Sequence, residues 1–329
     1  DMNRIFHRRR GFRLAILGVF FVAWAAVSFP GSARAAVTLE DEVKVGKEFY
    51  DKLVKSHALV EDESPNAYIS SLGKKILSHS GRPLFEFKFS IVQSAAVNAF
   101  ATPGGYVYVN QGLINLVNEE SQLAGVLAHE IAHVNSRHIA DIVDKSQVLT
   151  ISTLAAIIAG AFLGGDATAA VTTFSMATAS TLSLKYSREH EEEADRLGMG
   201  YMVAAGYNGQ AMLDFLKIMK RYEFYSNSIP SYFLTHPGTD ERIHYLDGLL
   251  QTTYTKKGAD EILGNLKRIQ TVLLINSKTA PSQNLRNFQK ILQENPNDAD
   301  ALYGLAVTQD KLGQSREALD TYQKALLLK

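Results

Sequence analysis

Hydrophobic side chains recur at helical spacing over most of the chain. Between residues 38 and 80 they return every three or four positions, which predicts two amphipathic helices with a break near Ser64 and Pro65. From Leu113 onward every clear period is again that of a helix. The pattern therefore predicts a mainly helical fold.

One stretch between these helical parts has the period of a strand. Over residues 85–91 apolar side chains alternate with charged or polar ones, and a second apolar run follows the turn Pro103-Gly104-Gly105. This second run is Tyr106, Val107, Tyr108 and Val109. It is compatible with a sheet edge that binds substrate as an added strand, or with an ordinary core hairpin. Together with the helices, the small β-sheet predicts an α+β fold.

The first 35 residues have the pattern of a secretory signal peptide. Five arginines between positions 4 and 13 precede an uncharged apolar stretch over residues 14–29, and Ala33-Arg34-Ala35 has the form of a cleavage site. The apolar stretch is shorter than the ~20 residues that span a bilayer, which favours a cleaved signal over an anchor helix. We therefore predict export to the bacterial periplasm.

Composition excludes several classes of function. The 329 residues are 46% hydrophobic and include no cysteine, so a packed core is expected and cysteine nucleophiles, thiolate metal sites and iron–sulfur clusters are excluded. The basic and acidic residues balance at 34 each, but the signal peptide contains six of the arginines. The mature chain is therefore acidic, which argues against nucleic acid as a partner.

The candidate chemistry lies on a helix predicted to begin near Asn118. His129 and His133 are four residues apart, so both imidazoles point to the same side of the helix and can bind one metal ion. Glu130 lies about 100° around the helix axis, beside the position that a catalytic metal leaves open. These three residues predict a metal site.

A second predicted helix, which ends at Gly206, can complete this site. Glu191 and Asp195 are four residues apart and share a face. Glu191 can supply a third ligand, and Asp195 can accept a hydrogen bond from the remote ring nitrogen of His129 or His133. An acidic segment by itself is typical of a solvated helix face. We interpret three of its other residues in that way: Glu189, Glu192 and Glu193.

The ordered set of motifs resembles the M48 family of zinc metalloproteases, and within it an exported bacterial branch with C-terminal tetratricopeptide repeats. The matching positions are 98–105, 129–133, 137–138, 191–195, 205–207, 235–237 and 242–243. The resemblance implies one Zn²⁺ per chain, held by His129, His133 and Glu191. It also implies Glu130 as general base in an endopeptidase reaction without a covalent intermediate.

His236 has several interpretations. A lone histidine before Pro237 is typical of a turn or a helix cap. The resemblance implies instead an active-site role, either as a fourth zinc ligand that restrains activity or as a group that stabilises the oxyanion. We favour the fourth ligand.

Residues 146–184 carry no charge apart from Asp166. The pattern allows a membrane hairpin, but the many serine and threonine residues of its second half favour a helical pair that covers the cleft as a lid or a membrane-facing surface. Peripheral membrane contact through this stretch is therefore one expectation.

The C-terminal residues have the spacing of a 34-residue tetratricopeptide repeat. The matching positions are Leu302, Leu305, Ala306, Gly313, Ala318, Tyr322 and Ala325, with part of a preceding unit at Phe288, Ile291 and Pro296. The alternative is a plain helical hairpin. Such a short array is expected to pack against the preceding domain and to dock other proteins.

We accordingly divide the chain into a signal peptide (1–35), a zinc metalloprotease domain (36–255) and repeat-like helices (256–329). The resemblance implies that the chain cleaves unfolded or misassembled envelope proteins in periplasmic quality control and outer-membrane protein assembly. Expected partners are extended polypeptides and an envelope assembly partner at the repeats. The alternatives are a repeat-based chaperone or adaptor with a restrained or structural zinc site, and a zinc hydrolase of small peptides.

Overall fold

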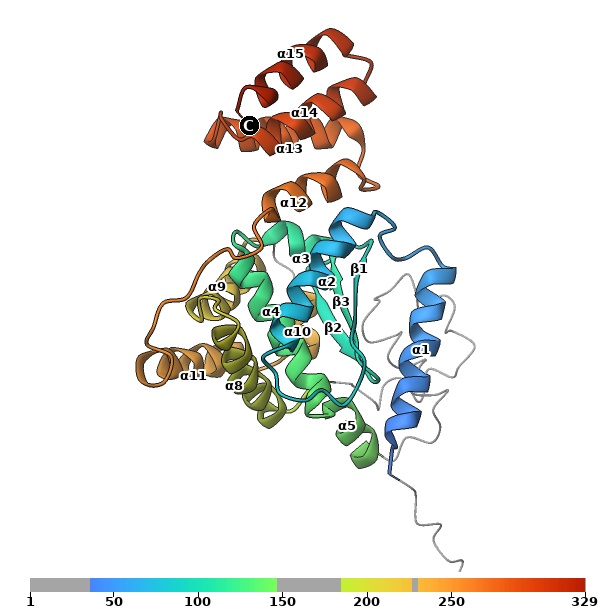
Figure 1. Ribbon diagram of the computed structural model, residues 1–329, viewed down its shortest axis with the longest axis vertical. Helices are drawn as coiled ribbons and strands as arrows, with labels where there is room; N and C mark the ends of the chain where they lie inside the picture. Colours follow the sequence, from blue (N-terminus) through green and yellow to red (C-terminus); the bar gives the residue numbers. More distant parts are fainter. Residues whose placement is uncertain (1–35, 147–184, 227–229, 329) are drawn as a thin grey trace, which may run out of the picture. The chain divides into compact units, whose positions relative to one another are not determined.

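The computed structural model describes residues 36–146, 185–226 and 230–328. The predicted signal peptide and almost all of the uncharged stretch lie outside them. In chain order the described elements are α1 (Leu39–Lys55), α2 (Glu63–Leu77), β1 (Lys88–Val92), β2 (Ala99–Thr102), β3 (Tyr106–Asn110), α3 (Gln111–Leu116), α4 (Glu120–Asn135), α5 (His138–Ser146), α8 (Arg188–Ala204), α9 (Gln210–Ser226), α10 (Ser231–Thr235), α11 (Thr239–Thr252), α12 (Leu266–Ile275), α13 (Pro281–Glu294), α14 (Ala299–Lys311) and α15 (Ser315–Leu326) (Figure 1). The predicted α+β class, mainly helical with a small sheet, is confirmed.

The sheet differs from its predicted form in one respect. Its strand order is β1-β3-β2, with β3 parallel to β1 and antiparallel to β2. The hairpin of β2 and β3 is present, and Gly104 and Gly105 adopt the positive φ that its turn requires. However, Tyr106–Val109 belong to the central strand, whose backbone groups pair on both sides. Of the two interpretations given above, the sheet edge is therefore wrong, and these residues belong to a core hairpin.

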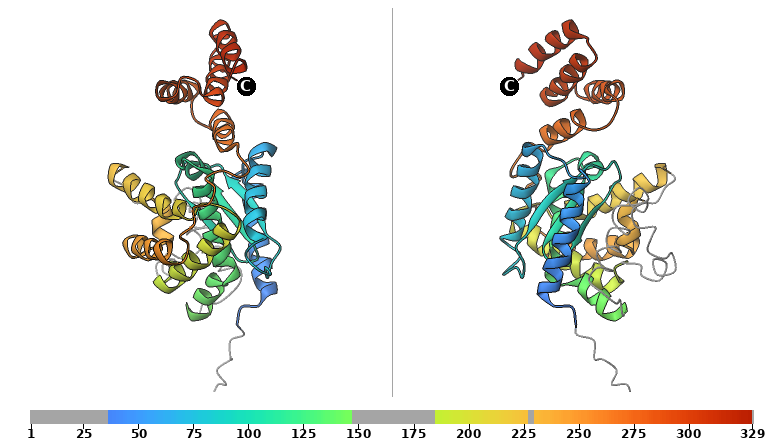
Figure 2. Two further views of the ribbon diagram at one scale, coloured as in Figure 1. Left: turned by 60° about the vertical axis from the view of Figure 1, so that its left-hand side comes forward. Right: turned by 90° about the vertical axis from the view of Figure 1, so that its right-hand side faces the viewer.

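Helices cover both faces of the sheet (Figure 2). On one face, Phe49 of α1 contacts the rings of Phe100 and Tyr108. On the other, buried residues of α2 and α4 share one core with Val107 and Val109. Because successive strand residues point to opposite faces, the one apolar run of β3 serves both cores.

The boundary of α2 also differs from the predicted one. The helix begins at Glu63, after the N-cap Asp62, and includes Ser64 and Pro65 in its first turn. Proline is tolerated there because the first backbone N–H groups of a helix have no partner within it. The proline therefore marks the start of a helix, whereas the pattern had suggested an interruption.

The C-terminal helices pack in two groups. Helix α12 contributes Leu266, Ile269 and Leu273 to the main core. Its Gln270 side chain also donates to the backbone oxygens of Ile114 and Val117, at 2.8 Å each. Helices α13 and α14, together with the end of α12, form a smaller core around Phe288, whose ring packs against Gly304. The predicted helical repeat region is therefore confirmed.

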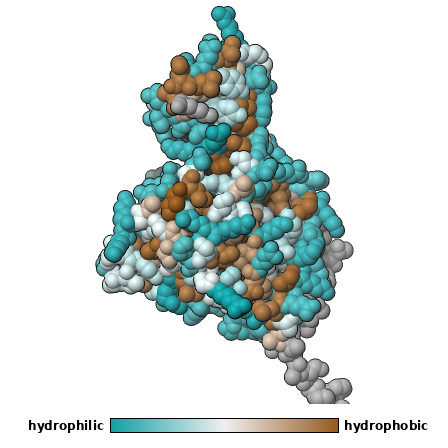
Figure 3. All heavy atoms as spheres, viewed as in Figure 1, coloured by the Kyte–Doolittle hydropathy of each residue, from teal (hydrophilic) through white to brown (hydrophobic). Residues whose placement is uncertain are grey.

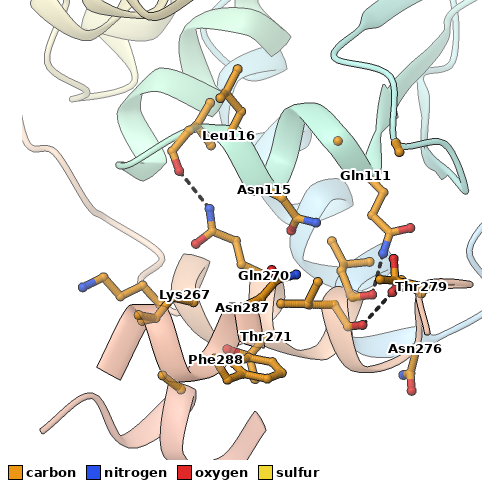
Figure 4. Close-up of a pocket in the computed structure, with 18 of the residues that line it drawn as sticks. Gln111, Asn115, Leu116, Lys267, Gln270, Thr271, Asn276, Thr279, Asn287 and Phe288 are labelled. Carbon is orange, nitrogen blue, oxygen red and sulfur yellow. Dashed lines mark hydrogen bonds between the residues drawn. The ribbon is translucent and has the colours of Figure 1, made fainter. Parts of the chain in front are cut away.

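A groove of about 1220 Å³ lies between α3 on one side and α12 and α13 on the other. Figure 4 shows that amide side chains line much of it, among them Asn115, Asn276 and Asn287. Large apolar side chains, including Leu319 and Leu326, are exposed on the last helix, and Figure 3 shows hydrophobic residues on the surface of the repeat region. Within the described ranges, none of the helices combines the length and the apolar character of a membrane span.

Helices α4 and α8 approach each other closely at Gly198. A Cβ atom on this residue would lie 3.0 Å from the backbone of Ala128 and of His129. Glycine therefore permits the close crossing of the two helices that carry the candidate site residues. In contrast, a Cβ on Gly248 of α11 would meet nothing within 4 Å.

We expect Gly198→Val to destabilise the protein by about 1–3 kcal/mol, because the added atoms force the two helices apart. Urea denaturation would measure the free energy of unfolding. The matched variant Gly248→Ala should be neutral or stabilising by up to about 1 kcal/mol, since alanine is the better helix former and the space is open. Equal destabilisation of both variants would contradict the proposed close packing.

Candidate metal centre

Helix α4 presents the first three site residues from an almost wholly buried surface. Its N-cap is Glu119, one residue later than predicted, and the backbone N–H of Asn118 donates to the side chain of Gln122 instead. His129, Glu130 and His133 are each at most 2% exposed. Polar groups so deeply buried need partners, and for His129 and His133 some of these come from elements far away in the sequence.

Helix α8 supplies the acidic partner. It begins with a capping box between Ser187 and His190, and it ends before Gly206, which has a φ of 94° as predicted for a helix stop. Its buried face carries Glu191 and Asp195. The crossing of α8 with α4 therefore brings two carboxylates against the imidazoles.

Four side chains converge in one cluster. The Nε2 atoms of His129 and His133 are 2.9 Å apart, and they lie 3.4 and 3.3 Å from the two carboxylate oxygens of Glu191. Nδ1 of His236 lies 3.0 Å from Glu191 Oε1 and 3.3 Å from His129 Nε2. One ligand atom from each of the four residues lies within 4.8 Å of the others. This compact group of imidazole and carboxylate donors fits a zinc ion.

The ionisation of the cluster suits a cation. Burial and the charge of His129 hold the pKa of His133 well below its ordinary value. Burial acts to raise the pKa of Glu191, but the charges of His236 and Arg242 outweigh it and hold that pKa well below the usual range. Neutral His133 and ionised Glu191 are the forms that bind metal.

His129 is held by a second carboxylate. Its Nδ1 lies 2.9 Å from Asp195 Oδ1, so of the two histidines considered for Asp195, the structure places it beside His129. Burial and Arg242 act to lower the pKa of His129, but Glu191 and Asp195 outweigh them and raise it to about 9. A cation would therefore compete with a proton at this imidazole.

Glu130 lies beside the cluster. Its two carboxylate oxygens are buried and have no hydrogen-bond partner among the described residues, while Nε2 of His236 lies 3.4 Å from one of them. Burial raises its pKa, against the opposing charges of His236 and His129. A carboxylate with unused acceptors and a raised pKa can take a proton from water.

Arg242 is a site residue for which the motif comparison had assigned no role. Its Nε and Nη2 donate to the two oxygens of Asp195 at 2.7 Å each, and its Nη1 lies 2.7 Å from Glu191 Oε2. One guanidinium thus balances two buried carboxylates. Its place in the sequence, six residues after His236, does not reveal this contact.

Tyr186 and His138 lie beside His133, and the sequence patterns assigned a role to neither. The ring of Tyr186 stacks on His133 with centroids 3.8 Å apart, and Nδ1 of His138 lies 2.8 Å from His133 Nδ1. Burial and His190 lower the pKa of His138 to about 4. Glu193, interpreted above as part of a solvated face, lies 3.3 Å from His138 Nε2 through its Oε2. Glu193 is therefore only partly solvated, because its half-exposed carboxylate also contacts His138.

The predicted substrate-binding residues are not part of this cluster. Tyr108 packs between Phe49 and Phe100, and the ring of Tyr106 lies 5.6 Å from that of Tyr50. Tyr106 and Tyr108 thus belong to the core on the α1 side of the sheet, whereas Val107 and Val109 belong to the core on its other face.

Comparison with known proteins agrees with the motifs. Residues 63–250 match peptidase family M48, and residues 287–320 match a tetratricopeptide repeat. The chain is 32% identical over 216 residues to the beta-barrel assembly-enhancing protease of Escherichia coli, a match that covers 64% of this chain and 44% of that protein. The corresponding protein of Yersinia pestis is 31% identical over 215 residues, with the same coverage. The chain thus spans less than half the length of these curated relatives.

A more distant relative comes from mitochondria. The mitochondrial metalloendopeptidase OMA1 of Schizosaccharomyces pombe is 26% identical over 224 residues, which cover 67% of this chain and 64% of that protein.

Arg242→Met should lower the free energy of unfolding by about 3–5 kcal/mol, because it leaves two buried carboxylates without their counter-charge. Arg242→Lys should recover only part of this loss, since an ammonium cannot form the two parallel hydrogen bonds. Urea denaturation with and without zinc would measure both. Arg188→Met, which removes an exposed pair with Glu241, is the control and should change little. Wild-type stability of Arg242→Met would contradict the assigned charge balance.

Proposed function

Because the chain belongs to peptidase family M48, we propose that it is a zinc-dependent endopeptidase that cleaves unfolded or misassembled cell-envelope proteins in the periplasm. The observation that carries this proposal is the buried cluster of His129, His133 and Glu191 beside the buried carboxylate of Glu130, whose oxygens accept no hydrogen bond from the described residues. The relatives named beta-barrel assembly-enhancing proteases support the envelope setting and a link to outer-membrane protein assembly.

Each side chain of the cluster has a separate role in this proposal. His129, His133 and Glu191 would hold one zinc ion per chain, with the Nε2 atoms of both histidines facing Glu191. Zinc in such a site supplies a Lewis acid for the peptide carbonyl and activates water. Glu130 accepts the proton of the attacking water and passes it to the leaving amine. Asp195 accepts a hydrogen bond from the Nδ1–H group of His129, which leaves the Nε2 of His129 without a proton and able to bind the metal.

His236 restrains the site in this proposal. Its Nδ1 lies within 3.3 Å of both Glu191 Oε1 and His129 Nε2, in the position of a fourth ligand. Its Nε2 faces Glu130. In this position His236 would take the place of water as a fourth ligand of a bound ion, and its Nε2 faces the general base. Hydrolysis would then require that substrate displaces His236.

The repeat helices have a docking role in this proposal. Asparagine side chains such as Asn115 and Asn287 can donate to and accept from any peptide backbone, so the groove suits extended polypeptides of varied sequence. The exposed apolar residues of the last helix suit a protein partner in envelope assembly. The groove also favours the second candidate function, a repeat-based adaptor whose zinc site stays restrained by His236.

The proposed domain boundaries remain 1–35, 36–255 and 256–329. Support comes from the break between α11 and α12, which separates residue 252 from residue 266, and from the two family matches on either side of it. Export through a signal peptide and membrane contact through residues 146–184 are parts of the proposal that rest on sequence pattern alone.

Glu130→Gln should abolish cleavage of an unfolded protein, with a loss of at least about 100-fold, because the amide cannot accept the proton. Zinc content should stay near one ion per chain, since no proposed ligand is removed. Cleavage would be followed by gel electrophoresis and zinc by elemental analysis. Unchanged cleavage would contradict the enzyme, whereas unchanged function in the cell despite lost cleavage would favour the adaptor.

His236→Ala should raise the rate of cleavage several-fold, because it opens the fourth position and frees Glu130. The initial rate on an unfolded protein measures this, with zinc content as a check on the three remaining ligands. The control is His244→Ala, an exposed histidine on α11, which should leave the rate unchanged. A lower rate in His236→Ala would mean that His236 stabilises the oxyanion and does not restrain the site.

A further inference from the structure

The side of His133 that faces away from the cluster contacts a second histidine. Its Nε2 faces His129 and Glu191, while its Nδ1 lies 2.8 Å from Nδ1 of His138. The other nitrogen of His138, Nε2, lies 3.3 Å from Oε2 of Glu193. Three side chains thus form a line from the metal cluster to the half-exposed carboxylate of Glu193.

Proton positions along this line follow from the chemistry of imidazole. A ring nitrogen binds a metal through its lone pair, so Nε2 of His133 must carry no proton and its Nδ1 must carry one. At 2.8 Å, Nδ1 of His138 must then accept that proton's hydrogen bond. The proton of neutral His138 therefore lies on Nε2, where Glu193 can accept it. The carboxylate selects the tautomer of His138, and His138 selects that of His133.

Packing holds both rings in place. Tyr186 stacks on His133, and the ring of His190 stacks on His138 with centroids 4.3 Å apart and an interplanar angle of 20°. His190 is itself held by Asp141 at 2.9 Å. Because His138 is only 2% exposed, water cannot readily replace it as the acceptor for His133.

The two histidine ligands are therefore supported differently. His129 contacts the carboxylate of Asp195 directly, whereas His133 contacts a neutral imidazole. We propose that His138 and Glu193 are positioning residues that fix the orientation and the tautomer of His133 and so raise the affinity of the site for zinc. This inference rests on the proposed function only in taking His133 as a zinc ligand through Nε2.

The test compares two replacements of His138 in the full chain. His138→Leu fills the space but cannot accept a hydrogen bond, whereas His138→Asn can place its carbonyl oxygen near the position of Nδ1. Zinc affinity, measured by competition with a chromogenic chelator, should fall by about 10–100-fold in His138→Leu. It should stay close to that of the wild type in His138→Asn. The metal-free melting temperatures of the two variants should be similar.

A variant of the adjacent residue, Glu192, is the matched control for a variant of Glu193. Glu193→Ala should lower zinc affinity by less than His138→Leu does, because Glu193 is 45% exposed and water can accept from His138 in its place. Glu192→Ala removes the exposed carboxylate of the adjacent residue and should leave the affinity unchanged. A loss confined to the Glu193 variant supports the proposed line of hydrogen bonds.

Two results would overturn the inference. One is wild-type zinc affinity in His138→Leu. The other is an equal loss in His138→Leu and His138→Asn, which would mean that ring packing matters and the acceptor does not. A wild-type chain without measurable zinc affinity would overturn the proposed function as well, so the two failures are distinguishable.

Discussion

The crossing of α4 and α8 is the constraint on which the rest of the site depends. At Gly198 the two backbones come so close that a single methyl group would contact both Ala128 and His129. Only at this separation can Glu191 lie within 3.4 Å of two imidazoles. The sheet and α2 support this arrangement indirectly, by fixing the surface on which α4 lies.

That crossing forces charges into a low-dielectric interior, where each must be compensated. Arg242 balances Glu191 and Asp195 together, and Asp195 in turn holds His129. The donors are thus held in place before a metal arrives, which lowers the entropic cost of binding it. The negative charges of Glu191 and Asp195 can be buried here because Arg242 and a bound cation together can balance them.

Some of the fold and of the site could be predicted because local periodicity carries the information. The spacing of His129 and His133 places both rings on one side of any helix, and the four-residue step from Glu191 to Asp195 does the same on a second helix. The choice of which strands pair leaves no comparable periodic pattern in the sequence. Tyr106–Val109 therefore fitted an edge as well as a core hairpin, although each of these residues pairs with a β1 residue 18 positions earlier in the chain.

The sequence by itself determined which residue types can hold a metal, on which helices they lie and that repeat helices follow. Only the tertiary structure decided that Asp195 meets His129, that Arg242 spans two carboxylates, and that Glu193 reaches His138. The reason is that periodicity describes one element at a time. Which faces meet, and in what register, depends on packing between elements that are 40 to 100 residues apart in the chain.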